Sequence, residues 1–335
     1  MSTVQPTGRV AAAAVPTKAT KPRWEEQLLT GSRGPALALL VLGLALTIYS
    51  PFFLTKDNLL NVIDQVTVLG VLALGMTAVI IIAGIDLSVG SVLALAMMVV
   101  GWLSHDGGLP MPIAIIGGLA AGAAAGAVNG VMVTKAKLPA FIATLAMFSV
   151  ARGLANVITD GQQIVGFPDS FTNLASSRLF GWVSATVALL IILYVAGWAF
   201  LRYRANGRAL YALGGSAEVA RLAGLKTTRL TIAVYTVTGL LAGVAAVILA
   251  MRLDSAQPSA ATGYELDTIA AVVIGGASLS GGVGSVGGTA LGVLIIGVLR
   301  NGLSLMSVSP FVQMVVIGVV IALAVMLDVL RRKEA

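Results

Sequence analysis

Long apolar segments follow one another along most of this chain, with few polar residues between them. Ten can be counted, at residues 35–54, 66–83, 88–104, 111–133, 138–158, 182–201, 230–251, 265–281, 286–303 and 311–330. A helix needs about 20 largely apolar residues to cross a bilayer. Charged residues make up only 10% of the chain, well below the share of about 25% in ordinary globular domains. The sequence therefore predicts an all-α, polytopic helical membrane protein with about ten transmembrane helices, some of them short or broken.

Basic residues gather in four places, and this distribution predicts the orientation of the chain. They lie in the N-terminal stretch 1–33, at Lys135 and Lys137, in residues 202–229 and in residues 331–333, which together hold 16 of the 21 lysines and arginines. Cytoplasmic loops are enriched in Lys and Arg. Ten spans with both termini inside satisfy that rule, so we expect a flexible cytoplasmic tail at 1–33, a transmembrane domain at 34–330 and a cytoplasmic tail at 331–335. The net charge of +7 follows from these loops and does not indicate nucleic-acid binding.

Residues 202–229 form the most basic internal loop, and a short helix is expected in its middle. Ser216 can serve as the N-cap, Glu218 suits the positive end of the helix dipole, and Gly224 can end the helix. A helix of about two turns is not stable alone in water. The pattern therefore favours packing against the membrane domain or a soluble partner; the alternative is a solvated loop with a simple turn.

The first interruption of the apolar pattern is at residues 84–91, where Gly84, Asp86, Ser88, Gly90 and Ser91 break a long apolar run. A carboxylate inside a membrane is costly and needs partners or water. One interpretation is a broken helix that lines a transport pathway. The other, which we favour for the side chain of Asp86, is a turn near the cytoplasmic face in which Asp86 caps the next helix.

The second interruption is the glycine-rich segment 275–288, which includes Ser278 and Ser280. It lacks the Gly-Lys-Ser/Thr ending of a phosphate-binding loop, so nucleotide hydrolysis by this chain is not expected. We interpret it as a tight turn between helices and, with residues 84–91, as a candidate to shape a pathway. The chain has no cysteine, one histidine and no catalytic constellation, so no catalytic residue, metal site or cofactor is predicted. Few ionisable residues lie inside the apolar segments, which disfavours an ion-coupled carrier.

The two halves of the chain share a weak repeat of one sequence pattern. Asn129-Gly130 is followed by Pro139, and Asn301-Gly302 is followed by Pro310. The first linker carries two lysines and the second none, which predicts opposite faces of the membrane and hence a possible inverted repeat. Chance is the alternative, because Gly, Asn and Pro also punctuate turns.

Several motifs carry a family resemblance, in order from about residue 51 to residue 328. They include Gly-Met-Thr-Ala at 75–78, Gly-Ile-Asp-Leu-Ser-Val-Gly-Ser at 84–91, Leu-Pro-Ala-Phe-Ile-Ala-Thr-Leu at 138–145, Ala-Arg-Leu-Ala-Gly-Leu at 220–225 and Gly-Gly-Val-Gly-Ser-Val at 281–286. On these motifs the chain resembles the permease subunits of ribose-type sugar ABC importers. Branched-chain amino-acid permeases share the general plan and remain the alternative, with an ATP-independent carrier behind them.

The resemblance implies a non-catalytic subunit of the inner (plasma) membrane, surrounded by lipid, that passes a sugar between two copies or between itself and a paralogue. Its implied partners are a cytoplasmic ABC ATPase subunit and an extracytoplasmic sugar-binding protein. The family's ATPase-coupling segment would fall on Gly214, Gly215, Ser216, Glu218, Ala220, Arg221, Leu222 and Gly224. The family commonly has Asn after the Gly-Gly pair, where this chain has Ser216; both residues are good N-caps.

Overall fold

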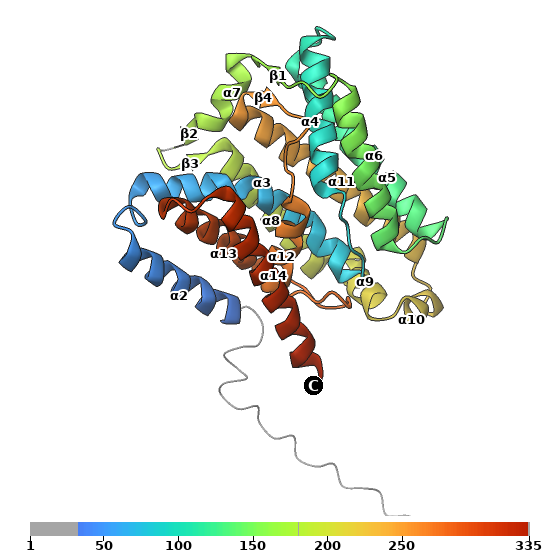
Figure 1. Ribbon diagram of the computed structural model, residues 1–335. Helices are drawn as coiled ribbons and strands as arrows, with labels where there is room; N and C mark the ends of the chain where they lie inside the picture. The colour runs from blue at the N-terminus through green and yellow to red at the C-terminus, as the bar shows by residue number, and fades with distance from the viewer. Residues whose placement is uncertain (1–32, 180, 334–335) are drawn as a thin grey trace, which may run out of the picture.

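The computed structural model describes residues 33–179 and 181–333, and this part of the chain is almost entirely helical (Figure 1). The first half contains α2 (Arg33–Tyr49), α3 (Lys56–Ile81), α4 (Val89–His105), α5 (Met111–Thr134), α6 (Ala140–Val157) and α7 (Asp169–Ser176). The second half contains α8 (Ala185–Tyr203), α9 (Ala205–Gly215), α10 (Ala217–Leu222), α11 (Thr227–Leu253), α12 (Tyr264–Ile274), α13 (Val286–Leu305) and α14 (Pro310–Lys333).

Within residues 33–179 and 181–333 the chain also forms four strands of two residues each. β1 (Ile164–Val165) pairs antiparallel with β4 (Ser255–Ala256), and β2 (Arg178–Leu179) pairs antiparallel with β3 (Val183–Ser184). The first pair joins the loop after α6 to the loop after α11, which are far apart in sequence. The all-α class predicted from the sequence is confirmed.

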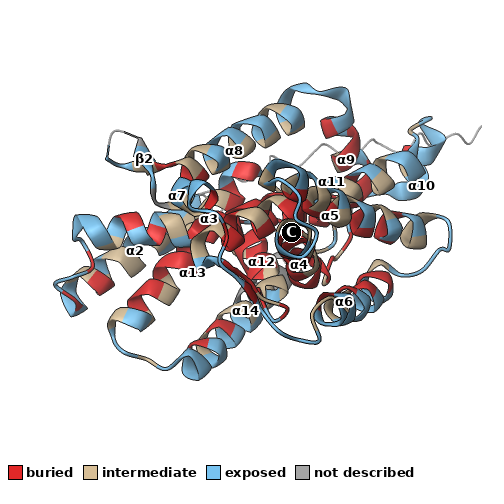
Figure 2. Cartoon of the chain, turned by 90° about the horizontal axis from the view of Figure 1, so that it is seen from above, coloured by how far each residue is buried: buried red, intermediate tan, exposed pale blue. Residues whose placement is uncertain are grey.

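Helix α3 forms the centre of the molecule. Every residue from Val66 to Thr77 is buried, and α8, α11, α12 and α13 all pack against this helix. Seen from above, the buried residues concentrate on α3, α4, α11 and α12, whereas α2, α6 and α8 expose much of their surface (Figure 2). The exposed surface of these outer helices is rich in large apolar side chains such as Ile48, Ile192 and Val157. An apolar exterior of this kind suits a lipid environment.

The crossing of α5 and α11 brings two backbones into direct contact. A Cβ atom added at Gly126 would lie 2.9 Å from the carbonyl carbon of Tyr235 and 3.1 Å from the Cα atom of Gly239. One turn further along, a Cβ at Gly122 would lie 3.1 Å from the backbone nitrogen of Gly243. Small residues allow this close approach, which in a membrane replaces the hydrophobic effect as a source of helix association.

All ten predicted apolar segments fall on helices, although their ends differ. Six helices of the described part, α3, α5, α6, α8, α11 and α13, are long and apolar enough to cross a membrane. Shorter apolar helices are α2, α4 and the Pro310–Leu323 part of α14. The chain is thus a helical membrane protein by length and composition.

Two predicted segments extend past the ends of their helices, and in both the helix end has a local cause. The segment predicted at 265–281 ends early, because α12 stops at Ile274 and Gly276 adopts a left-handed φ of +91°. The segment predicted at 35–54 also ends early, because α2 stops at Tyr49, shortly before Pro51. The residue preceding a proline disfavours the helical conformation, so helices commonly end there. At the other end, α14 continues to Lys333 and takes in most of the predicted C-terminal tail, while the predicted N-terminal tail lies outside the described residues except for Arg33.

Candidate functional site

The basic loop 202–229 folds into two helices, where the sequence predicted one. The short helix α10 follows the prediction, because the Ser216 hydroxyl accepts a hydrogen bond from the backbone nitrogen of Val219 at 3.3 Å, and Gly224 has a φ of +83° after its end. The sequence pattern missed α9, which precedes it. On α10, Ala220 is buried, whereas Val219 and Leu222 are 63% and 77% exposed. Glu218 and Arg221 are also exposed, so the helix presents apolar and charged groups together.

The buried end of α9 meets the end of α3 and the glycine-rich loop at one point. Gly214 packs so closely that an added Cβ would lie 2.6 Å from the backbone nitrogen of Gly282 and 2.9 Å from the carbonyl carbon of Ile81. The same Gly282 nitrogen donates a 2.8 Å hydrogen bond to the Ile81 carbonyl oxygen. We call this meeting of Ile81, Gly214, Gly281 and Gly282 the glycine junction.

The glycine-rich loop between α12 and α13 is shaped for this contact. Gly281 and Gly282 have positive φ angles of +84° and +73°, and a Cβ at Gly281 would lie 2.6 Å from the Cβ atom of Ala83. Tyr211 of α9 donates a hydrogen bond from its hydroxyl to the Gly284 carbonyl oxygen at 3.0 Å, and burial raises the pKa of this tyrosine. The predicted tight turn thus also contacts α9 of the basic loop.

The predicted interruption at 84–91 is an unwound connection between α3 and α4, and its polar groups are buried. Asp86, Ser88 and Asn129 are all at most 2% exposed. One carboxylate oxygen of Asp86 accepts from the backbone nitrogen of Ser88 at 2.8 Å and from its hydroxyl at 2.6 Å, and Asn129 donates to the same hydroxyl at 2.9 Å. Both of these hydrogen bonds come from Ser88, which is the N-cap residue of α4. The prediction that Asp86 caps the next helix is therefore wrong, because its carboxylate holds Ser88 and not the first turn of α4.

The structure brings two of the three predicted segments into contact and places the third, residues 84–91, next to them. The basic loop and the glycine-rich loop meet at the glycine junction, next to the residues that enter the 84–91 segment. Ser278 is buried and accepts from the backbone nitrogen of Ser280 at 3.2 Å, whereas Ser280 is exposed. Gly90 and Ser91 begin α4, where a Cβ at Gly90 would lie 2.6 Å from a carboxylate oxygen of Glu265. Within the described residues, no hydrogen bond joins Asp86 to Ser278 or Ser280.

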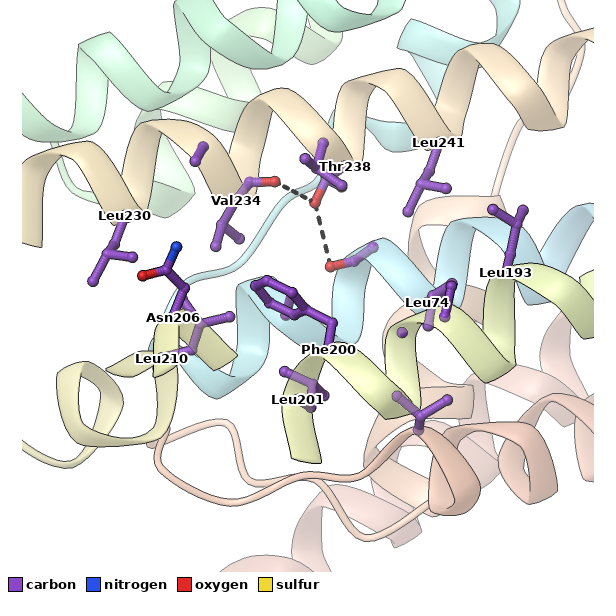
Figure 3. Close-up of a pocket in the computed structure, with 17 residues that line it drawn as sticks. Leu74, Leu193, Phe200, Leu201, Asn206, Leu210, Leu230, Val234, Thr238 and Leu241 are labelled. Atoms are coloured by element: carbon purple, nitrogen blue, oxygen red, sulfur yellow. Dashed lines mark hydrogen bonds between the residues drawn. The ribbon is translucent and has the colours of Figure 1, made fainter. Parts of the chain in front are cut away.

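An apolar cavity of about 450 Å³ lies beside the glycine junction, between α3, α8, α9 and α11 (Figure 3). Leucine, valine, alanine and phenylalanine side chains line most of it, with Asn206 entering from α9. Thr238 of α11 donates to the Gly75 carbonyl oxygen of α3 at 3.3 Å across one wall. The cavity leaves free space between the basic loop and the membrane helices that flank it.

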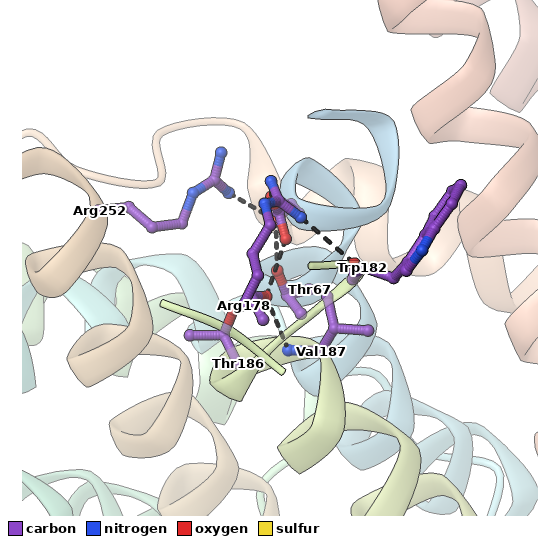
Figure 4. A network of polar contacts seen from close by, with 8 residues as sticks. Thr67, Arg178, Trp182, Thr186, Val187 and Arg252 are labelled. Atoms are coloured by element: carbon purple, nitrogen blue, oxygen red, sulfur yellow. Dashed lines mark hydrogen bonds and ion pairs between the residues drawn. The ribbon is translucent and has the colours of Figure 1, made fainter. Parts of the chain in front are cut away.

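Sequence reasoning missed two groups of charged residues. Asp267 of α12 pairs with Arg300 of α13 at 2.5 Å, and Arg178 pairs with Asp64 of α3 at 2.5 Å. Arg252 of α11 donates to the Asp64 backbone carbonyl oxygen at 2.8 Å, and so joins the second group (Figure 4). A signal was present, because Asp267 and Arg300 lie inside predicted spans, and opposite charges in neighbouring spans mark functional or pairing sites.

The described residues contain no group of three or more His, Cys, Asp or Glu side chains able to hold a metal ion. Arg152 lies within α6, and its guanidinium donates to the backbone carbonyl oxygens of Pro258 and Ala260 at 2.6 and 2.9 Å. Its role in this structure is to anchor the loop between α11 and α12.

Comparison with known proteins covers most of the chain. The ribose import permease protein RbsC of Bacillus subtilis is 46% identical over 90% of this chain and 93% of its own length. RbsC of Escherichia coli K12 is 45% identical over 87% of this chain and 92% of its own length. The L-arabinose ABC transporter permease protein AraH of Azospirillum brasilense is 35% identical over 96% of this chain and 94% of its own length. No solved structure matches the chain.

The family model described as branched-chain amino acid transport system / permease component matches residues 58–325. The match runs from the start of α3 into α14 and contains the glycine junction, both interrupted segments and the basic loop. The relatives are similar over almost their whole length, so the chain belongs to this family of transport permeases. Within the family it belongs with the ribose-type sugar ABC permeases.

Proposed function

We propose that this chain is the membrane-spanning subunit of an ABC importer that carries ribose or a similar monosaccharide. The observation that supports the proposal most is the 46% identity to a ribose import permease, which extends over nine-tenths of the chain. In this role the chain has no catalysis of its own. A partner ATPase hydrolyses ATP in the cytoplasm, and an extracytoplasmic sugar-binding protein delivers the sugar.

The topology proposed is ten spans with both termini on the cytoplasmic side of the cell inner membrane. The concentration of 16 of 21 basic residues on one side supports it, because cytoplasmic loops attract Lys and Arg. On this topology the tails 1–33 and 331–335 and the loop 202–229 lie inside, and the charged group around Asp64 lies outside. The inverted-repeat hypothesis goes with it: Asn129-Gly130 lies near the C-terminal end of α5, before α6, and Asn301-Gly302 lies near the C-terminal end of α13, before α14.

We further propose that α10 docks on the ATPase and that the glycine junction carries the movement into the membrane. Exposed Val219 and Leu222 give α10 an apolar contact surface, with Glu218 and Arg221 beside it. Because Gly214 touches the end of α3 and the loop before α13, a displacement of α9 acts on both helices. The ATPase must bind the inward- and outward-facing states with different affinity for this to shift their populations.

The assembly proposed is two copies of the chain, or this chain with a paralogue, surrounded by lipid. Helix α14 supports a contact surface, because Phe311, Met314 and Val315 are 79%, 61% and 66% exposed. Residues 84–91 and 275–288 remain the candidates to shape the pathway. Their buried polar groups fit a structural role of Asp86 in holding the unwound connection.

Reconstitution tests the proposed function. The chain, its ATPase and its sugar-binding protein are placed in liposomes, and uptake of radiolabelled D-ribose is followed with and without ATP. Uptake that needs ATP and all three components is expected. Uptake by the permease alone would favour an ATP-independent carrier, and uptake of leucine in place of ribose would favour the branched-chain amino-acid alternative.

A further inference from the structure

We infer that a second, polar cavity in this chain is a contact site for a single neutral sugar ring on its way through the membrane. The inference rests on the proposed function and adds a location to it. The cavity measures about 330 Å³ and lies between α3, α11, α12, α13 and α14. Its polar walls include Arg252, Tyr264, Asp267, Arg300, Ser304 and Gln313. Ligand cavities in proteins typically measure about 300–1,000 Å³, so one small solute fits.

The polar cavity and the apolar cavity beside α9 differ in chemistry, and of these two the polar one suits a polyhydroxylated solute. The larger one beside α9 is lined mainly by leucine, valine and alanine, with Asn206 and Thr238 as its polar groups. A sugar there would lose its hydrogen bonds to water and gain few in return, which is costly. The polar cavity offers two guanidinium groups, a carboxylate, a phenol, a hydroxyl and an amide. These groups supply both donors and acceptors for ring hydroxyls.

The acidic wall of the cavity is a buried ion pair. Asp267 is 3% exposed and its carboxylate accepts from Arg300 at 2.5 Å. This pair uses one Nη2 donor of Arg300, and a guanidinium has five N–H donors in total. The remaining donors and the carboxylate oxygens can bind a hydroxyl without breaking the pair. A neutral solute also leaves the charge balance of the pair unchanged, whereas a charged one would not.

Arg252, on the opposite wall of the cavity, is held in position by hydrogen bonds outside the cavity. Arg252 donates to the backbone carbonyl oxygen of Asp64 at 2.8 Å, and the carboxylate of Asp64 is itself held by Arg178 at 2.5 Å and by the Ser184 hydroxyl at 2.8 Å (Figure 4). Gln313, on the third wall, is buried and donates from its amide nitrogen to Ser304 and to the Val308 carbonyl oxygen. Both hydrogen bonds use the nitrogen, which leaves the amide oxygen of Gln313 as an acceptor. A site whose groups are positioned in advance binds at a lower entropic cost.

The location of the cavity also suits a transport site. Helix α12 is a short helix of 11 residues that begins inside the fold, next to Gly90 at the start of α4. Substrate sites in membrane transporters commonly form at such discontinuous helices. Because Asp267 and Arg300 already satisfy one another, a sugar gains little from each contact and leaves easily. A pathway needs sites of this kind, attractive enough to enter and weak enough to leave.

Two conservative variants test the inference in the complete complex of permease, ATPase and sugar-binding protein. Tyr264→Phe removes one hydroxyl, and Gln313→Leu replaces the amide by an apolar group of similar size. Each variant is expected to lower the initial rate of D-ribose uptake about 2- to 10-fold, the range for one lost hydrogen bond. The uptake ratio of D-ribose to 2-deoxy-D-ribose should also change. Tyr49→Phe, at a side chain 74% exposed on α2, is the matched control and should transport at the wild-type rate.

The uptake ratio separates a sugar contact from a purely structural role, because loss of folded complex lowers uptake of both sugars equally. If both variants transport ribose at the wild-type rate with an unchanged ratio, the inference is overturned and the proposed function stands. If both rates fall with an unchanged ratio, the cavity residues are structural and the inference is also overturned. If the wild-type complex carries no sugar, the proposed function itself fails.

Discussion

Replacing Gly214 by alanine is expected to disconnect the basic loop from the membrane helices without unfolding the chain. The new Cβ would lie 2.6 Å from the Gly282 nitrogen and 2.9 Å from the Ile81 carbonyl carbon, and closer still to the Ile81 carbonyl oxygen. All three are backbone atoms, so no side chain can rotate away. Overpacking of this kind costs about 1–3 kcal/mol, and the 2.8 Å Gly282–Ile81 hydrogen bond that it disturbs is worth about 0.5–1.5 kcal/mol.

The total of roughly 1.5–4.5 kcal/mol is below the stability of a typical folded protein, about 5–15 kcal/mol, so the chain should stay folded and relieve the collision by moving α9 away. The assay measures D-ribose uptake and ATP hydrolysis by the purified complex. Uptake should fall at least tenfold while the ATPase stays bound, and ATP hydrolysis should no longer respond to the sugar-loaded binding protein.

Gly215→Ala is the matched control, because it changes the neighbouring glycine, where an added Cβ would meet none of the described atoms within 4 Å. Uptake by this variant should stay within about twofold of wild type, because the added methyl group enters open space. Normal uptake by a folded Gly214→Ala complex would refute the reasoning. Equal losses for both variants would show that contact with the ATPase, and not the glycine junction, limits transport.

Three further perturbations test other parts of the molecule. Leu222→Asp places a charge on the most exposed apolar residue of α10, so the ATPase recovered with the permease should fall about tenfold, while membrane insertion measured by fractionation stays normal. Asp86→Asn weakens the two hydrogen bonds to Ser88, and should lower the yield of assembled complex at least as much as uptake; a well-assembled complex with altered sugar preference would show that Asp86 contacts the sugar. In the topology test, a cysteine at Asp169 should react with an impermeant reagent from outside, and one at Ser216 only after permeabilisation; external labelling at Ser216 would contradict the ten-span orientation.

Local signals in the sequence were sufficient for the helical framework. Every predicted apolar segment contains a helix, because a long apolar run can satisfy its backbone in a membrane only by forming one. The cap at Ser216 and the end at Gly224 were also predictable, since they depend on residues within a few positions of each other. The role of residues 214–224 in binding the ATPase stays a prediction.

Contacts between residues far apart in the sequence could not be predicted from such local signals. Nothing near Gly214 in the sequence indicates that its backbone touches Ile81 and Gly282, more than 65 residues away on either side. The polar cavity was missed for a different reason. Arg300 and Asp267 lie inside two predicted apolar spans, and the presence of opposite charges in two spans is the signal that indicates such a pair.

The backbone contact between α5 and α11 determines which parts of the protein can move. With Gly126 packed against Tyr235 and Gly239, neither helix can slide or rotate by one residue without a collision between main chains. The two helices, with α4 packed against both, therefore act as a rigid body. Hinge motion must then occur elsewhere, and the open space between α3, α8 and α9 offers the room for it. We therefore expect α8 and α9 to tilt against this frame when the protein changes state.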